Sequence, residues 1–433
     1  MIWNAEYESM DREALLALQL RRLQTTVSWV YERVPYYRQR LDAAGVRPKD
    51  VRSREDLFRL PFTDKTALRD TYPFGMFAVD LEHVVRVHSS SGTTGKPIVV
   101  GYTKGDLSTW SECTARVAAA AGVTAKDRVQ MAFLYGMFTG GWGMHYGIER
   151  IGATVIPAGS GNTERHLMMM QDFGTTAVVG TPSYALYLAE VGEGAGVDFS
   201  QLALRVGLFG GEPCGEHMRA EIERRLHLTA TDNYGLTEII GPGVAGECEC
   251  RCGLHINEDH FLAEIVDPVT GEPMPEGEEG ELVLTSLTKE AFPVLRFRTH
   301  DLTALDHTEC ACGRTLARMR KVRHRTDDML IVRGVNVYPS QVEDVLLKIE
   351  GIAPHYLIVV DREHGMDRME VRIEVPEEIF SDVMADMVAF TGNVSDRLNA
   401  VLGLSVKVTL VEPGTVARTS GKARHVVDNR SME

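Results

Sequence analysis

The feature of this sequence that most restricts its fold is a regular alternation of strand-like and helix-like segments in the middle of the chain. Apolar runs typical of strands occupy 153–157, 177–181, 206–211 and 229–235, and stretches typical of helices occupy 163–173, 183–192 and 215–227. This alternation predicts a parallel sheet covered by helices. Ligands of such sheets bind at the carboxyl ends of the strands. The residues expected there, as candidates for ligand binding, include Gly211, Glu212, Pro213, Asp232, Asn233 and Tyr234.

The segments on either side of this region have a different character. Residues 9–45 show the apolar spacing of helices, residues 260–305 consist of short β-like runs and turns, and the last hundred or so residues form a small α+β pattern. A chain of 433 residues is too long for a single core. We therefore predict an α/β protein with two domains. A large N-terminal domain, 1–326, has helix-covered, mostly parallel sheets and a β-subdomain, and a small α+β C-terminal domain covers 327–433.

The overall charge and hydropathy exclude some classes of partner. The net charge of −15 argues against nucleic acid, which requires a basic surface. The sequence has no run of about 18 apolar residues, so no membrane-spanning helix and no membrane partner are expected. The first residues lack the basic and apolar pattern of a signal peptide. We therefore expect a cytoplasmic protein.

A run rich in hydroxyl groups and glycine, S-S-S-G-T-T-G-K-P at 89–97, lies between the strand-like segments 84–88 and 98–102. Backbone N–H groups and hydroxyls in such a loop can surround a polyphosphate, with the lysine as a point charge. The loop is not a Walker A motif, because a proline and a strand follow the lysine. A solvated surface hairpin is the alternative interpretation. The predicted phosphate-binding residues are Ser90, Ser91, Gly92, Thr93, Thr94, Gly95 and Lys96.

Polar side chains at separated points offer groups suited to a nucleoside triphosphate, the kind of ligand that the hydroxyl-rich loop can surround. An enzyme that joins an anionic substrate to such a triphosphate must offset the triphosphate charge, hold Mg²⁺ and bring two anions together. Glu238, at a strand end, is suited to bind Mg²⁺, and Thr237 can donate a hydrogen bond to the α-phosphate. Asp301 can accept from the ribose hydroxyls, and Arg325 can reach ribose or phosphate. Each alone is equally typical of a surface charge or a cap, so their value lies in the combination.

The segment Y-G-M-F-T-G-G-W-G at 135–143 combines glycines with aromatic residues. Glycines let the backbone approach a flat ligand, and aromatic side chains supply its apolar walls. Composition alone favours a packed strand–helix junction equally.

The cysteines form two tight groups, C-E-C-R-C at 248–252 and C-A-C at 310–312, and His255 lies near the first group. In a reducing compartment such clustering indicates a metal rather than disulfides. Thiolates with a histidine suit tetrahedral zinc. Reduced cysteines in a loop are the alternative.

Several longer motifs carry a family resemblance. They are the aromatic segment, Y-G-L-T-E-I-I-G-P at 234–242, G-L-H-I-N-E-D-H at 253–260 and D-M-L-I-V-R-G-V-N-V-Y-P at 328–339. Together with the hydroxyl-rich loop, they resemble the phenylacetate–CoA ligase family and its aryl-CoA ligase relatives, within the acyl-adenylate-forming superfamily. The resemblance runs from near Val34 to the end of the chain.

The resemblance implies a two-step reaction. ATP and an aryl carboxylate give aryl-AMP and pyrophosphate, after which the mobile C-terminal domain rotates and the thiol of CoA attacks. It implies that Lys422 reaches the carboxylate and acts with Thr237 and Glu238, and that Asp327 is the hinge. It also implies a homodimer. The residues implied for CoA are Gly334 and Arg333, those for the aryl acid are Tyr135, Phe138, Gly140, Trp142, Ile240 and Pro242, and those for structural zinc are Cys248, His255, Cys310 and Cys312.

Two departures from the family pattern leave the acid open. His324 stands where the family has glycine, and Trp142 stands where a smaller aliphatic residue is expected. Because a tryptophan would shorten or reshape the pocket, benzoate-like, hydroxylated or amino-substituted aryl acids are alternatives to phenylacetate. The thiol is also open, because a stand-alone enzyme that loads an aryl acid onto a carrier protein shares the first half-reaction. Lys422 and Glu238 argue against a non-catalytic nucleotide-binding module.

Overall fold

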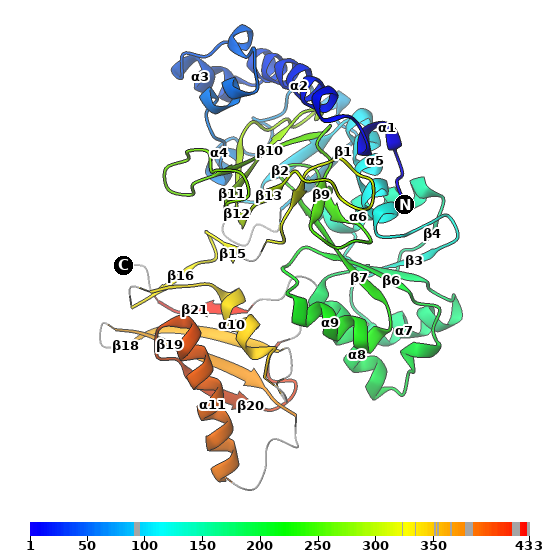
Figure 1. Cartoon of the computed structure of the whole chain (residues 1–433), viewed down its shortest axis with the longest axis vertical. Helices are drawn as coiled ribbons and strands as arrows, with labels where there is room; N and C mark the ends of the chain where they lie inside the picture. Colours follow the sequence, from blue (N-terminus) through cyan, green and yellow to red (C-terminus); the bar gives the residue numbers. More distant parts are fainter. Residues whose placement is uncertain are drawn as a thin grey trace.

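The computed structural model describes residues 1–90, 96–322, 324–333, 335–349, 352, 355–363, 366–376, 384–417 and 425–430. These residues form a large N-terminal unit of sheets and helices and a smaller C-terminal unit, which lies at the lower left of Figure 1. Among the described residues, no helix has both the length and the apolar character needed to cross a bilayer.

The predicted alternation of strands and helices builds the parallel half of the largest sheet. In the described part of the chain this sheet has the order β13-β14-β9-β8-β7-β6-β5-β3-β4, and β4, β3, β5, β6 and β7 run parallel. The parallel strands are β3 (Arg128–Met131), β4 (Thr154–Ile156), β5 (Ala177–Gly180), β6 (Val206–Gly210) and β7 (Thr229–Leu236). The helices that cover them are α5 (Lys104–Ala120), α6 (Thr139–Ile151), α7 (Thr163–Asp172), α8 (Pro182–Gly194) and α9 (Glu216–Leu226).

Helices cover both faces of this sheet. Val179 and Leu208 pack in one buried cluster with side chains of α5 and α6, whereas Val178 and Phe209 pack in another with α7, α8 and α9. A strand buried on both faces is apolar at every position. This explains why β5 and β6 read as continuous apolar runs.

The antiparallel half of the sheet was not predicted from the sequence. It consists of β8 (Gly241–Glu247), β9 (Leu254–Ile256), β13 (Leu305–Asp306) and β14 (Arg318–Met319). Strand β8 is fully buried although glycine and proline are frequent in it. A Cβ at Gly241 would lie 2.6 Å from the Trp110 ring, and a Cβ at Gly243 would lie 2.9 Å from the Thr114 methyl. Glycine is therefore needed for β8 to pack directly on α5.

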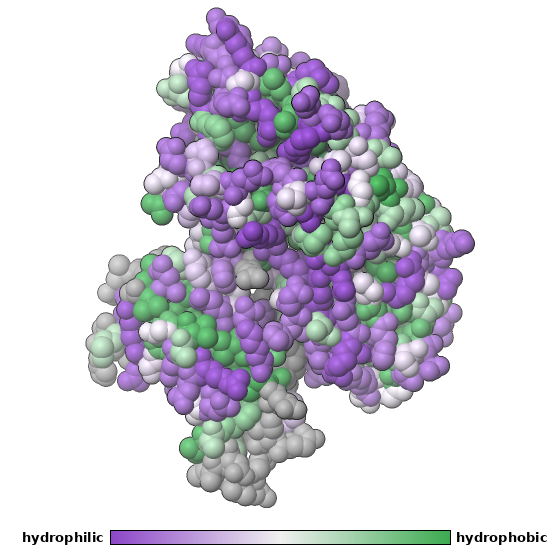
Figure 2. All heavy atoms as spheres, viewed as in Figure 1, coloured by the Kyte–Doolittle hydropathy of each residue, from purple (hydrophilic) through white to green (hydrophobic). Residues whose placement is uncertain are grey.

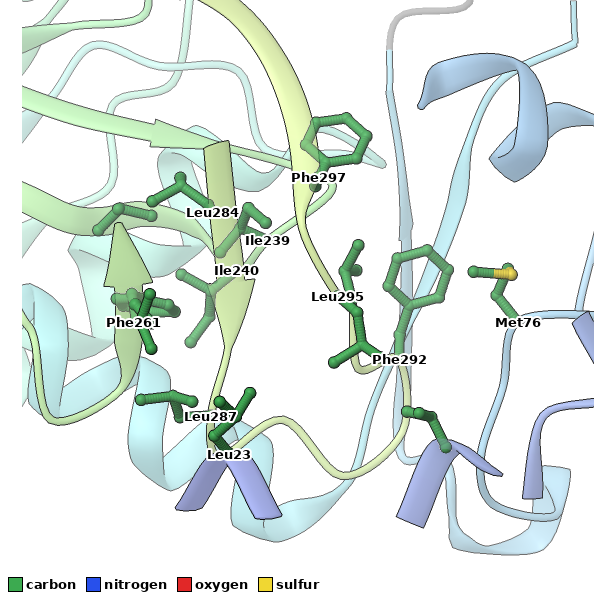
Figure 3. Close-up of a cluster of buried hydrophobic side chains, with 14 of the residues drawn as sticks. Leu23, Met76, Ile239, Ile240, Phe261, Leu284, Leu287, Phe292, Leu295 and Phe297 are labelled. Carbon is green, nitrogen blue, oxygen red and sulfur yellow. The ribbon is translucent and has the colours of Figure 1, made fainter. Parts of the chain in front are cut away.

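A β-subdomain and N-terminal helices share the largest buried cluster. The subdomain sheet has the order β10-β11-β12-β15 within the described residues, and the β1–β2 hairpin lies beside it. Figure 3 shows Leu23 of the N-terminal region and Ile240 among side chains of the subdomain. The elements are β1 (Arg86–Ser89), β2 (Val99–Tyr102), β10 (Phe261–Val266), β11 (Gly280–Ser286), β12 (Phe297–Thr303), β15 (His324–Arg325), α1 (Ala5–Glu8), α2 (Arg12–Arg33), α3 (Pro35–Ala43) and α4 (Lys65–Asp70).

The C-terminal unit has a core of its own. Its sheet has the order β20-β19-β18-β21, and a β16–β17 hairpin precedes it. Figure 2 shows apolar side chains gathered on this unit, while most of the remaining visible surface is hydrophilic. The fold class predicted from the sequence is confirmed. The elements are β16 (Leu330–Val332), β17 (Val335–Val337), α10 (Pro339–Leu346), β18 (Tyr356–Glu363), β19 (Met366–Glu374), α11 (Met384–Leu402), β20 (Lys407–Val411) and β21 (Val426–Asp428).

Candidate active site

Asp301 joins three strands at one edge of the candidate site. It lies in β12 and is 3% exposed. Tyr234 of β7 donates a hydrogen bond to its Oδ2 at 2.5 Å, and Arg325 of β15 forms an ion pair with its Oδ1. Burial raises the pKa of Asp301 above its ordinary value, and the Arg325 guanidinium opposes that rise. The predicted ribose and nucleotide residues Asp301, Tyr234 and Arg325 are therefore brought together.

The predicted hinge residue continues this chain of charges. The Nε of Arg325 lies 2.9 Å from Asp327 Oδ1, and Lys65 Nζ lies 3.0 Å from Asp327 Oδ2. Burial alone would raise the pKa of Asp327, but Arg325 and Lys65 lower it to about 2. Asp327 is thus a carboxylate held between two cations, at the turn between β15 and β16.

The predicted catalytic pair lies at the end of β7. Thr237 and Glu238 follow Leu236, the last residue of that strand, and each is 7% exposed. The hydroxyl of Thr237 lies 3.2 Å from the hydroxyl of Thr139, the first residue of α6. Because Thr139 belongs to the glycine and aromatic segment, the structure brings that segment against the Thr237–Glu238 pair.

The other predicted strand-end residues lie around β6 and β7. Glu212, which follows β6 with Gly211 and Pro213, accepts a hydrogen bond from the backbone N–H of Ser183 at 2.6 Å. Asn233 donates from Nδ2 to the carbonyl of Phe209 at 2.7 Å. Burial and the neighbouring Glu247 raise the pKa of Asp232 to about 7. These contacts join the carboxyl ends of adjacent parallel strands, where sheets of this kind bind ligands.

The predicted aromatic pocket residues contact one another. The Tyr135 and Trp142 rings meet edge to face, with centroids 5.1 Å apart, and Trp142 Nε1 donates to the carbonyl of Gly136 at 3.2 Å. Tyr135 and Phe138 pack against the α5–α6 cluster. A Cβ at Gly140 would lie 2.5 Å from the Phe138 ring, so a larger residue there would force that ring to move.

Ile240 and Pro242 take part in the core behind this segment. Ile240 is 2% exposed and belongs to the largest buried cluster, as Figure 3 shows. The carbonyl oxygens of both residues accept hydrogen bonds from buried aromatic side chains, Tyr102 for Ile240 and Trp110 for Pro242. Tyr102 and Trp110 therefore hold the backbone that follows Glu238 at these two positions.

The structure describes the two ends of the hydroxyl-rich loop, at Ser90 and at Lys96. Ser90 donates from its backbone N–H to the carbonyl of Ile98 at 2.9 Å, and its hydroxyl accepts from the Ile98 N–H at 3.0 Å. Lys96 is exposed, and its ammonium lies 5.3 Å from the centre of the Tyr72 ring.

The exposed Arg333, a candidate for CoA binding, donates from Nε to the carbonyl of Asp367 at 2.7 Å. The predicted residues that lie outside the described part of the chain are Ser91, Gly92, Thr93, Thr94, Gly95, Gly334 and Lys422.

The predicted metal ligands form one cluster. Atoms of Cys248, His255, Cys310 and Cys312 that can bind a metal all lie within 4.8 Å of one another. The Cys248 and Cys310 sulfurs are 3.8 Å apart, and the Cys312 sulfur is 3.5 Å from His255 Nε2. A tetrahedral site with Zn–S of about 2.3 Å and Zn–N of about 2.0 Å requires separations of about 3.8 Å and about 3.5 Å. The donor set therefore fits zinc.

The second nitrogen of His255 supports the same geometry. Nδ1 lies 3.3 Å from the carbonyl of Leu316, which can only accept, so Nδ1 donates and Nε2 is directed to the sulfurs. Burial lowers the pKa of His255 to about 4, so the imidazole is neutral, as a metal ligand must be.

Three residues near the site were not singled out from the sequence. Thr139 lies within the aromatic segment, Lys65 is the first residue of α4, and Arg86 is the first residue of β1, the strand before the hydroxyl-rich loop. The Arg86 guanidinium carbon lies 5.3 Å from the centre of the Trp142 ring and 4.8 Å from that of Tyr146. No local pattern marks an arginine on a strand as a cation that contacts distant rings, so only the fold reveals it.

Most of the chain matches two known protein families. Residues 76–288 match the family described as AMP-binding enzyme, and residues 334–430 match the AMP-binding enzyme C-terminal domain. A phenylacetate-coenzyme A ligase from Thermus thermophilus is 51% identical, over 99% of this chain and 100% of its own length. A phenylacetate-coenzyme A ligase from Escherichia coli is 47% identical, over 100% of this chain and 99% of its own length.

A solved structure matches the whole chain as well. A crystal structure of 2-hydroxyisobutyryl-CoA ligase in the postadenylation state, in complex with R3-HIB-AMP, is 30% identical and superposes with a TM-score of 0.93, covering 99% of this chain and 92% of the other. The same ligase in the thioesterification state, with 2-HIB-AMP and CoA, has a TM-score of 0.73 at the same coverage. The arrangement of the two units in this protein is therefore closer to the postadenylation state.

Proposed function

The chain belongs to the phenylacetate–coenzyme A ligase family of AMP-binding enzymes and is an AMP-forming acid–CoA ligase, and from this premise we propose that its acid is aromatic, either phenylacetate or a substituted benzoate. The observation that carries the proposal is the contact of Thr139 with Thr237. This contact links the aromatic segment, which is the proposed acid pocket, to Thr237 and Glu238, which are proposed to act at the phosphates. The carrier-protein alternative finds no support among these relatives.

The nucleotide is proposed to bind along the carboxyl ends of β6 and β7. Asp301 accepts the ribose hydroxyls, for which it retains capacity, since a carboxylate has about four lone-pair sites and two described partners here. Arg325 holds that carboxylate and adds positive charge. The proposed adenine and phosphate contacts come from Gly211, Glu212, Pro213, Asp232, Asn233 and Tyr234, and from Ser90 to Lys96 in the hydroxyl-rich loop.

Glu238 is proposed as the protein ligand of Mg²⁺. A buried carboxylate oxygen at a strand end is the kind of hard donor that this ion takes, together with phosphate oxygens. When bound, Mg²⁺ would neutralise charge on the phosphates. Thr237 donates its hydroxyl hydrogen to the α-phosphate, and the contact with Thr139 orients that hydroxyl.

The acid is proposed to lie against Tyr135, Phe138, Gly140 and Trp142, with Ile240 and Pro242 behind it. Trp142 is held on two sides, by the Tyr135 edge and by the stacked Tyr146 ring at 5.9 Å. A ring fixed in this way favours a flat substrate, because aromatic pairs prefer defined edge and stacked geometries. It also shortens the space open to the acid, which supports benzoates as well as phenylacetate.

The second step is proposed to use a mobile C-terminal domain that begins at Asp327, after an N-terminal domain of residues 1–326. Lys422 reaches the carboxylate in the first step, and Gly334 and Arg333 contact CoA in the second, as the family resemblance implies. A homodimer is predicted on the same ground, whereas the cytoplasmic location is predicted from the pattern of the first residues and of apolar runs; both remain predictions. Cys248, His255, Cys310 and Cys312 are proposed to hold one structural zinc, on the tetrahedral separations given above.

A single incubation tests the proposed reaction. It contains the enzyme, ATP, Mg²⁺, CoA and an equimolar pool of phenylacetate, benzoate, and hydroxy- and aminobenzoates, and mass spectrometry identifies the products. An aryl-CoA with stoichiometric AMP supports the proposal and names the acid. Activity with 2-hydroxyisobutyrate or another aliphatic acid, but with none of the aryl acids, would overturn the aromatic assignment while leaving the ligase activity intact.

A further inference from the structure

A column of buried side chains lies directly behind the turn that carries Thr237 and Glu238. We define the aromatic column as His88, Tyr102, Trp110 and Lys289. The Tyr102 and Trp110 rings are stacked, with centroids 4.8 Å apart and planes inclined by 17°. The Lys289 ammonium lies 3.2 Å from the centre of the Tyr102 ring, and the His88 ring meets both aromatic rings edge-on at 5.5 and 5.6 Å.

The column is bonded to the backbone immediately after Glu238. Tyr102 donates from its hydroxyl to the carbonyl of Ile240 at 2.9 Å, and Trp110 donates from Nε1 to the carbonyl of Pro242 at 2.8 Å. All four groups are buried, so each bond is shielded from water. Gly241 stands between these two anchor points in the left-handed region, with a φ of 98°.

The column also contacts the other two parts of the site. His88 is 2% exposed and donates from Nδ1 to the carbonyl of Met137 in the aromatic segment, at 3.0 Å. It is followed at once by Ser89 and Ser90, where the hydroxyl-rich loop begins. A Cβ at Gly143 of α6 would lie 2.6 Å from the Trp110 ring. One set of rings therefore touches the phosphate loop, the acid segment and the catalytic turn.

Lys289 is unusual within the column. The residue is 7% exposed, and its buried ammonium has no hydrogen-bond partner among the described residues. A buried ammonium without a bonded anion is costly unless another group stabilises it. The face of Tyr102 attracts the cation and so fixes the ring plane from the side opposite Trp110.

We propose that the aromatic column positions the Thr237–Glu238 turn for adenylate formation, with Tyr102 and Trp110 as positioning residues that act through the carbonyls of Ile240 and Pro242. This inference rests on the proposed roles of Thr237 and Glu238. A rigid backbone anchor on the far side of the turn keeps the Glu238 carboxylate and the Thr237 hydroxyl aimed at the phosphates before substrate arrives, which is how preorganisation lowers a barrier.

The test compares Tyr102→Phe with Tyr37→Phe. Both changes delete one fully buried hydroxyl, but the Tyr37 hydroxyl bonds Thr63 and the Leu295 N–H rather than a carbonyl of the turn. Trp110→Phe provides a second variant that removes the other anchor and keeps a ring. Each purified protein is assayed for pyrophosphate release over a Mg²⁺ titration, for aryl-CoA formation from supplied aryl-AMP, and for its melting temperature.

Tyr102→Phe is expected to lower the adenylation kcat by about tenfold, the effect of one lost buried hydrogen bond, and to raise the Mg²⁺ concentration at half-maximal rate. Thioester formation from aryl-AMP should stay within about twofold, and Tyr37→Phe should change neither half-reaction beyond its effect on stability. Equal losses in Tyr102→Phe and Tyr37→Phe, or an unchanged Mg²⁺ dependence in both Tyr102→Phe and Trp110→Phe, would overturn the inference. Failure of the proposed function is distinct, because the unaltered enzyme would then release no pyrophosphate with any aryl acid.

Discussion

At the residue scale, Asp301, Arg325, Asp327 and Lys65 form a line of alternating charges from β12 to α4. Its two ends have different surroundings, since Asp301 is buried whereas Lys65 and Asp327 are part-exposed. Burial raises the pKa of Asp301, while two cations lower that of Asp327. The contrast is consistent with the roles proposed above, a fixed ribose contact for Asp301 and a movable hinge contact for Asp327, since an exposed ion pair is weak and easily exchanged.

The proposed role of Lys422 gives a first prediction. Lys422→Ala is expected to lower pyrophosphate release at least about 100-fold, because a cation at the developing charge is removed. The rate of aryl-CoA formation from supplied aryl-AMP should change little. Lys407→Ala is the matched control, since Lys407 is an exposed lysine of the same unit that pairs with Glu370. Equal loss of both half-reactions in Lys422→Ala would contradict the role.

Lys289 gives a prediction about stability and pH. Burial lowers its pKa from 10.5 to about 8. Between these values the unfolded chain binds more protons than the folded one, so stability rises with pH from about 8 to about 10.5 and the burial cost is complete below pH 8. Lys289→Met should therefore be more stable than the unaltered protein at pH 7, by up to about 3 kcal/mol, and the gain should shrink towards pH 10.

Urea titrations of the free energy of unfolding at pH 7, 8, 9 and 10 measure this difference. Lys126→Met, at an exposed position, is the control and should show no such pH dependence. If the column positions the catalytic turn, the stabilised Lys289→Met protein should also adenylate more slowly, since functional sites retain groups that cost stability. A variant that is less stable at every pH would refute the assignment of a burial cost to this ammonium.

At the element scale, the cysteine cluster ties together three strand ends of the antiparallel half-sheet. Cys248 follows β8, His255 lies in β9, and Cys310 and Cys312 lie in the loop between β13 and β14. Strand β9 has three residues, and β13 and β14 have two each. A metal that bonds all three segments would replace the stability that such short strands cannot supply from pairing and packing.

Metal analysis and melting temperature test this site. The unaltered protein is expected to contain about one zinc per chain, the number that one tetrahedral site requires. Cys310→Ser should lose the zinc and melt several degrees lower, because a ligand that binds only the folded state is lost. Cys250→Ser is the control, since Cys250 is exposed and outside the four-residue cluster. Full zinc content in Cys310→Ser would contradict the ligand set.

The elements also show what the sequence could and could not predict. The strands β5 and β6 were predicted because burial on both faces leaves a purely apolar run. Strand β8 was missed because its glycines, which make room for α5, have low intrinsic preference for strands. The cysteine cluster was predicted because its members are rare residue types. The aromatic column was missed because Lys289 is distant in sequence from Tyr102 and Trp110, and because each residue alone resembles a core or surface residue.

At the scale of the whole molecule, the C-terminal unit packs against the N-terminal unit, and Figure 1 shows α10 on the side of the C-terminal unit that faces α9. Leu347, just after α10, packs against the cluster formed by α7, α8 and α9. His355 Nε2 lies 3.1 Å from Glu190 Oε2 of α8. These contacts belong to the arrangement that resembles the postadenylation state. They must change if the unit rotates for the second step.

Leu347→Asp tests this arrangement. A carboxylate placed against the apolar cluster should disfavour the observed docking and lower the rate of pyrophosphate release by about tenfold, because the competent orientation becomes less populated. Thioester formation from supplied aryl-AMP uses the other orientation and should be unchanged or faster. Val401→Asp, at an exposed position of α11 in the same unit, is the control. Equal slowing of both half-reactions in Leu347→Asp would contradict the prediction.

The separate core of the C-terminal unit has a consequence for how such ligases diversify. Among the described residues, every side chain assigned to that core lies between Leu330 and Val426, whereas the proposed acid pocket lies between Tyr135 and Pro242. Mutations that reshape the acid pocket therefore leave the packing of the other unit undisturbed, and the reverse also holds. The acid pocket and the C-terminal unit can therefore vary independently, in natural relatives or in engineered chimeras.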